Sequence, residues 1–119
     1  MIGDDSGFDA IPTMNALLTS LHRSIDAGHI PALLLANPDL LYPVADRTYG
    51  FTSGSLAKLL EIGLEQLHPD KDLKFEVLGK PSRLIFETAL ASAGVHASRA
   101  VMFGDQLHTD IAGAQAAGI

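Results

Sequence analysis

The sequence predicts an α/β fold with a largely parallel sheet. Short apolar segments with the composition of buried strands alternate with longer segments whose apolar residues recur at helical spacing. Apolar residues make up 47% of the 119 residues and aromatic residues 6%, which is enough to fill a core and excludes an intrinsically disordered chain. A chain of this length fits one domain or a piece of a longer protein.

The first predicted elements are an amphipathic helix and a buried strand. The helix covers residues 13–27, with Thr13 placed to cap its start and Gly28 placed to end it. Residues 32–35 are continuously apolar, which is typical of a buried strand. This strand ends near Pro38, because proline has no N–H group for the next backbone hydrogen bond.

The middle of the chain predicts a loop, a helix and a second strand. Residues 39–55 contain proline, glycine and polar residues without a clear period, which predicts a long loop. A helix then begins at Ser55, and its leucines share one face as far as Leu67. Apolar residues alternate over residues 73–77, which predicts a strand.

The last part of the chain repeats the alternation. Pro81 suits the first turn of a third helix, which ends at Gly94. Residues 100–103 predict a third buried strand, and a last helix begins near residues 109–110 and ends at Gly118. The first helix has no strand before it and the last has none after it, although a parallel sheet needs both faces covered. We therefore expect a fragment of a longer protein.

Composition excludes several classes of function. Eight Lys and Arg against fourteen Asp and Glu give a net charge of -6, the wrong sign for binding nucleic acid or an anionic membrane surface. The chain has no cysteine, and its five histidines are scattered without a His-x-His or His-Glu-x-x-His pair that would indicate zinc. The longest apolar runs are far shorter than a membrane-spanning helix. We expect a cytoplasmic protein with no membrane or nucleic-acid partner.

The strongest chemical motif runs from Gly104 to Asp110 and follows the apolar segment 100–103. The carboxyl end of a strand is where ligands bind in open α/β sheets, so Asp105 lies at the expected position. Asp105 and Asp110 offer the hard oxygen ligands that Mg²⁺ prefers. The alternative is that Asp110 caps the helix and Asp105 is a solvated loop residue. Gly3, Asp4 and Asp9 repeat the pattern without a preceding strand, and we interpret that copy as a coincidence.

Two further motifs contain residues that suit a phosphate site. Lys80 precedes Pro81 at a helix start, where an ammonium group and free N–H groups converge on one anion; the alternative is a solvated lysine. Asn37 and Asp39 flank a proline at a strand end, a pattern that also forms ordinary turns. Residues 70–72, Asp-Lys-Asp, follow a helix and are expected to form a solvated turn.

Taken in order, residues 36–39, residues 79–81 and residues 104–110 resemble the motifs of the haloacid dehalogenase superfamily. The branch is class IIA, typified by p-nitrophenylphosphatase, with an α/β cap. The resemblance implies that residues 1–74 are the back half of the cap and residues 75–119 the returning part of a Rossmann-like core.

The resemblance also assigns roles to individual residues. It implies that Lys80 steadies the nucleophile and the phosphoryl group, and that Asp105 binds Mg²⁺ with Asp110 as a second or outer acid. It further implies that Asn37 and Asp39 shape the substrate entrance, for a small phosphorylated substrate. His108 could reach a bound phosphate, but we expect it only to line the loop.

The chain departs from the family pattern in one large respect. Members of the family carry an Asp-x-Asp motif near the N-terminus of the whole protein, which supplies the nucleophile for an aspartyl-phosphate, and a Ser or Thr in the second motif. Neither motif is present here, since the Asp-Lys-Asp sequence at residues 70–72 follows a helix. We therefore expect a fragment of a magnesium-dependent phosphatase that is inactive alone, with a homo-oligomer left open. The alternative is a non-catalytic α/β binding or interaction module. A nucleotide-binding domain is disfavoured, because no GxGxxG or Walker pattern is present.

Overall fold

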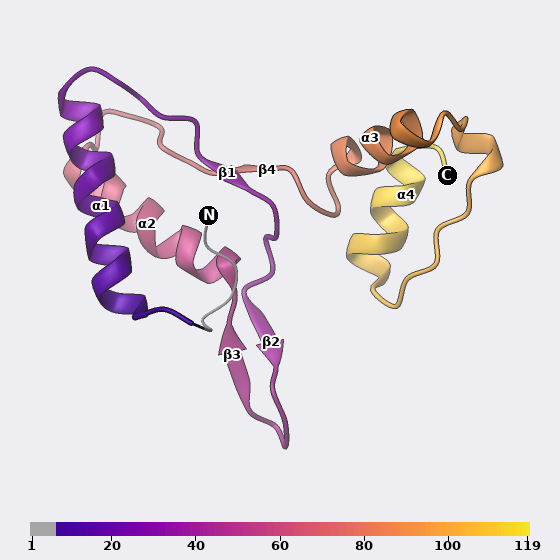
Figure 1. Ribbon diagram of the computed structural model, residues 1–119, viewed down its shortest axis with the longest axis horizontal. Helices are drawn as coiled ribbons and strands as arrows, with labels where there is room; N and C mark the ends of the chain where they lie inside the picture. Colours follow the sequence, from indigo (N-terminus) through magenta and orange to yellow (C-terminus); the bar gives the residue numbers. More distant parts are fainter. Residues whose placement is uncertain (1–6) are drawn as a thin grey trace. The chain divides into compact units, whose positions relative to one another are not determined.

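The computed structural model describes residues 7–119 and divides the chain into two compact units (Figure 1). The first unit ends at Glu76, and the second is Val77–Ile119. Gly3 and Asp4, the start of the coincidental motif copy, lie outside the described residues. The assignment of residues 1–74 to a cap and 75–119 to a core stays a prediction.

Two helices, α1 (Ala10–Asp26) and α2 (Ser53–Leu67), form the body of the first unit and lie side by side in Figure 1. Their shared core contains Ile25 and Leu64 with Leu73, and the Leu64 side chain is fully buried. The helix α1 begins earlier than predicted, because a proline is tolerated in the first turn of a helix and Pro12 lies there.

The strands of the first unit are shorter than predicted. The strand β1 (Leu34–Leu35) pairs with β4 (Glu76–Val77), and the Glu76 N–H donates to the Leu33 carbonyl at 2.8 Å. The predicted strands at residues 32–35 and 73–77 therefore exist, each reduced to its last two residues.

A β-hairpin occupies residues that were predicted to form a long loop, so that prediction is wrong. The strands β2 (Leu41–Pro43) and β3 (Tyr49–Phe51) pair antiparallel in this hairpin. The connecting turn uses Asp46 and Arg47 at φ of 42° and 64°. Aspartate tolerates a left-handed position, but glycine usually occupies the position after it in such turns, and Arg47 stands there instead, so the sequence signal is weak.

The second unit contains α3 (Arg83–Ala93) and α4 (Ala112–Ala116). The Ser82 hydroxyl accepts a hydrogen bond from the Leu84 N–H at 3.3 Å and caps α3, and Gly94 ends it at φ 63°, as predicted. A π-helical turn, Leu107–Ile111, leads directly into α4, so the last helical segment begins before residues 109–110.

Residues 100–103 do not form the predicted buried strand. The Val101 and Phe103 side chains are 75% and 88% exposed, and no strand pairs with this segment within residues 7–119. An apolar sequence favours a strand, but only a neighbouring strand can satisfy the backbone and cover the side chains.

None of the helices within residues 7–119 combines the length and apolar character needed to cross a bilayer.

Candidate active site

The loop that joins residues 100–103 to α4 contains a buried carboxylate that binds a lysine. The Asp110 side chain is only 4% exposed, and its Oδ1 accepts a hydrogen bond from the Lys80 ammonium group. Its Oδ2 accepts from the Gln106 backbone N–H at 3.3 Å. Lys80 and Asp110 are 30 positions apart in sequence, so the fold brings two of the predicted site residues into direct contact.

The Lys80 hydrogen bond is the largest cause that lowers the pKa of Asp110 below its usual value. Burial opposes this effect, and the backbone N–H groups of Gln106 and Asp105 add to it. Asp110 is therefore ionised at neutral pH, and the loop holds a paired positive and negative charge.

Gly104 is required by the close approach of Asp110. A Cβ atom built on Gly104 would overlap the Cβ atom and the carboxylate of Asp110. The φ of Gly104 is not in the left-handed region, so the space taken by the Asp110 side chain is the reason for a glycine at this position.

Asp105 differs from Asp110 in its surroundings. Its side chain is exposed and has no hydrogen-bond or ion-pair partner within residues 7–119. The Thr109 hydroxyl donates to the Gln106 side-chain oxygen at 2.8 Å and holds the loop between the two acids. The Asp105 carboxylate is therefore the hard oxygen ligand of this loop that has no protein partner. Both Asp110 oxygens, in contrast, accept hydrogen bonds from protein N–H groups.

Asp110 also partly fulfils the alternative role of helix cap. It lies inside the π-helical turn and reaches back to the N–H of Gln106, the residue that precedes this turn. This contact resembles the backward reach of an acid in a capping box, and it coexists with the Lys80 pair. His108 lies on the exposed face of the same turn.

Asn37 and Asp39 form a turn in the first unit, whereas Lys80, Asp105 and Asp110 belong to the second. The Asn37 side-chain oxygen accepts from the Asp39 N–H at 3.0 Å, the local bond that favours asparagine in turns. The Asp39 carbonyl accepts from the Thr52 hydroxyl and from the Gly54 N–H, and so anchors the start of α2. Their role at a substrate entrance stays a prediction.

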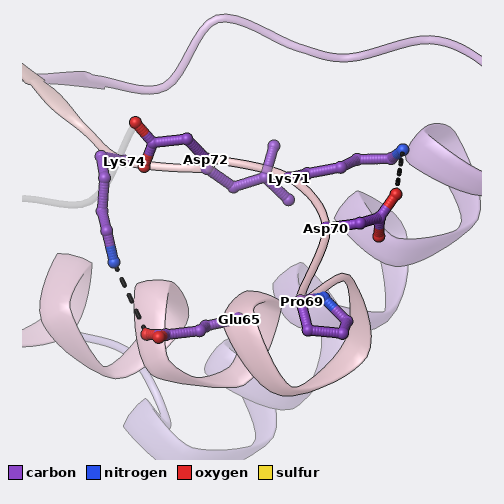
Figure 2. A pocket seen from close by; sticks show the side chains of 7 residues that line it. Glu65, Pro69, Asp70, Lys71, Asp72 and Lys74 are labelled. Atoms are coloured by element: carbon purple, nitrogen blue, oxygen red, sulfur yellow. Dashed lines mark hydrogen bonds and ion pairs between the residues drawn. The ribbon is translucent and has the colours of Figure 1, made fainter.

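The Asp-Lys-Asp sequence at residues 70–72 lies in a polar turn after α2, as expected. This turn lines an open pocket of about 360 Å³. Figure 2 shows the side chains that line it. The Lys71 ammonium group pairs with Asp70 at 3.4 Å, and Lys74 pairs with Glu65 at 3.6 Å. Each lysine that lines the pocket thus faces a carboxylate of the same pocket, which fits a solvated ionic surface.

A second polar cluster was missed by the sequence analysis. His22, Asp26 and His68 place one ligand atom each within 4.8 Å of one another. No local motif contains these residues, since 46 positions separate the two histidines. Only their contact across α1 and α2 reveals the cluster.

Comparisons with known proteins agree with the family resemblance and the fold. The HAD-hydrolase-like family model matches residues 77–119. Phospholysine phosphohistidine inorganic pyrophosphate phosphatase of Homo sapiens is 39% identical over 98% of this chain and 46% of that protein. A possible sugar phosphatase of the HAD superfamily from Cytophaga hutchinsonii matches with a TM-score of 0.73 and 28% identity, over 98% of this chain and 38% of its own. Glycerol phosphate phosphatase from Mycobacterium tuberculosis, solved in complex with magnesium, matches with a TM-score of 0.64 and 31% identity, over 87% and 28%.

These similarities place the α/β fold of this chain, which the sequence predicted, among the folds of the haloacid dehalogenase superfamily. The similar proteins agree with the class IIA branch of this superfamily, which the sequence motifs predicted. The chain spans less than half the length of the relatives described above.

Proposed function

We propose that this chain supplies the phosphate-binding lysine and the metal-binding acid of a magnesium-dependent phosphatase that acts on small phosphorylated compounds. Lys80 would contact the phosphoryl group, Asp105 would bind the metal, and Asp110 would position Lys80. The observation that carries the proposal is the Lys80–Asp110 pair, formed beside an acid whose carboxylate has no protein partner in the described residues.

Charge explains why the lysine needs a buried acid. A lone ammonium group on a four-carbon stem is mobile and strongly hydrated, so it is a poor fixed partner for a phosphoryl oxygen. An ionised Asp110 restrains the lysine at one place, where its remaining N–H donors stay free for an anion. Such a preorganised donor stabilises charge that develops on the phosphoryl oxygens.

The donor set of the loop fits magnesium. Mg²⁺ prefers hard oxygen ligands and usually combines one or two carboxylates with water and substrate oxygens. Asp105 matches this preference, whereas Asp110 would act from the outer shell, because Lys80 and Gln106 occupy its oxygens. When bound, the ion would neutralise phosphoryl charge and act as a Lewis acid. The nucleophile would come from outside residues 1–119.

The assay uses the protein in the form in which the cell produces it. It measures the release of phosphate from p-nitrophenyl phosphate and from small phosphorylated metabolites. We expect turnover to need Mg²⁺ and to be abolished by Asp105→Asn, whereas Asp4→Asn leaves it unchanged. Equal losses for both variants would contradict the assignment.

The chain 1–119 alone should show no turnover above an Asp105→Asn control, since a phosphatase without its nucleophile retains only a small residual rate. Robust release that disappears in Asp105→Asn would mean that another carboxylate, such as Asp70 or Asp72, is the nucleophile. No turnover in the cellular protein would favour the non-catalytic binding module.

A further inference from the structure

We propose that His22, Asp26 and His68 form a site for a divalent transition metal of the zinc class, which joins the ends of α1 and α2. This proposal concerns only the first unit and does not rest on the proposed phosphatase function. His22 and Asp26 are one helical turn apart near the end of α1, and His68 is the residue that directly follows α2.

The distances within the cluster suit a shared metal ion. The His22 Nδ1 and His68 Nε2 atoms are 3.1 Å apart. Two nitrogens bound to one tetrahedral zinc at about 2.0–2.1 Å are separated by about 3.3 Å, which is comparable with this separation. The Asp26 carboxylate lies beside the other nitrogen of each ring, 3.4 Å from His22 Nε2 and 3.9 Å from His68 Nδ1, and one ligand atom from each of the three residues lies within 4.8 Å of the other two.

The electrostatic surroundings favour a cation. The last carbonyl groups of a helix carry partial negative charge, and the ends of both α1 and α2 lie at this cluster. Asp26 adds a full negative charge. Two neighbouring imidazoles joined by one hydrogen bond need at least one unprotonated ring nitrogen, which is the form that binds metals.

Burial differs among the three side chains in a way that suits metal entry. The His68 side chain is only 7% exposed. The His68 backbone N–H donates to the carbonyl of the core residue Leu64 at 2.8 Å and fixes the backbone at this position. The His22 and Asp26 side chains are 37% and 59% exposed. One fixed ligand and two accessible ligands leave room for solvent to complete the coordination of the ion.

The chemistry of the donors separates this cluster from the acidic loop of the second unit. Imidazole nitrogen suits zinc, copper and nickel, whereas magnesium prefers carboxylate and water oxygen. A zinc ion at the cluster should therefore bind in the presence of a large excess of magnesium.

The test is a calorimetric zinc titration of the metal-free chain in millimolar magnesium. We expect one zinc ion per chain, and about a tenfold or greater loss of affinity in His22→Ala and in Asp26→Asn. The matched controls, His29→Ala and Asp72→Asn, change exposed residues of the same types outside the cluster and should bind like the wild type. Cobalt should give the visible absorption bands of a tetrahedral site in the wild type and the controls only.

Thermal unfolding provides a readout that does not depend on activity. Zinc should raise the midpoint of the wild type and the controls, because an ion that binds only the folded state stabilises it, and should leave His22→Ala unchanged. Circular dichroism without metal shows whether each variant is folded. Absence of saturable zinc binding, displacement by millimolar magnesium, or an equal loss in the controls would overturn the proposal and leave a hydrogen-bonded histidine pair.

Discussion

Glu61 offers the sharpest test of how the first unit is held together. Its side chain is 6% exposed on α2, its Oε1 accepts from the Phe75 N–H at 2.7 Å, and its Oε2 accepts from the Lys58 ammonium group at 2.7 Å. Burial alone would raise the pKa of Glu61, but the bonds from Lys58 and Phe75 and the charges of Lys58 and Lys74 lower it overall. Glu61 thus ties α2 to the segment before β4 as a carboxylate.

Glu61→Ala leaves the Phe75 N–H without its acceptor, which costs about 1–3 kcal/mol. The exposed Lys58 pair adds at most about 1 kcal/mol. We expect a total loss of about 2–3 kcal/mol, measured by urea denaturation followed by circular dichroism. Glu61→Gln keeps an oxygen for Phe75 and should lose about 1 kcal/mol.

The pH dependence gives the sign of the charge effect. Because the pKa of Glu61 is lowered in the folded state, its ionic stabilisation is complete above the unfolded value of about 4.5 and is lost as the pH falls through the folded value. The stability difference between wild type and Glu61→Gln should therefore shrink in acid. The control is Glu65→Gln, an exposed α2 residue paired with Lys74, which should cost less than about 0.5 kcal/mol. A cost for Glu65→Gln as large as that for Glu61→Ala would refute the reasoning.

Three other perturbations have defined outcomes. Gly104→Ala should displace Asp110 and destabilise the second unit by about 1–3 kcal/mol in urea titrations, because the added Cβ meets a buried side chain. Gly63→Ala, whose Cβ meets only the flexible end of Leu18 at 2.9 Å, is the control and should be neutral or stabilising; equal losses in the two variants would be the contrary result. Leu64→Ala should cost about 2–5 kcal/mol in the same assay, and a loss under about 1 kcal/mol would contradict its place in the core. The wild type should lose stability as the pH falls through the lowered pKa of Asp110, and Asp110→Asn should remove this loss. The measurement is acid-induced unfolding. The same unfolding curve at low pH in both proteins would contradict the pairing of Asp110 with Lys80.

Helix ends were predictable from the sequence where a single residue determines them. Gly28 and Gly94 follow α1 and α3 at φ of 83° and 63°, a conformation that favours glycine. The hairpin was not predictable, because Asp46 and Arg47 adopt similar dihedral angles without the residue types that signal them. A left-handed backbone position can be predicted from the sequence only where a residue type that favours this conformation, such as glycine, occupies it.

Contacts between distant residues set the other limit of prediction. Periodicity located α1 and α2, but it could not give the rotation of each helix about its axis, which decides that His22 meets His68. The sequence named Lys80 and Asp110 as separate candidate residues, but it could not show that the two form an ion pair. Residues 100–103 were predicted to be a strand, and they have no neighbour to pair with in the described residues.

The spacing of the two acids in the loop explains why they have different surroundings. Asp105 precedes the π-helical turn and remains exposed, whereas Asp110 lies within the turn and points back toward Gly104. A π-helical turn widens the helix, and such turns are frequent at functional sites. The missing side chain of Gly104 provides the space for the Asp110 carboxylate, which can therefore be buried and still reach Lys80. Burial therefore commits Asp110 to protein donors, whereas the Asp105 carboxylate stays exposed to solvent.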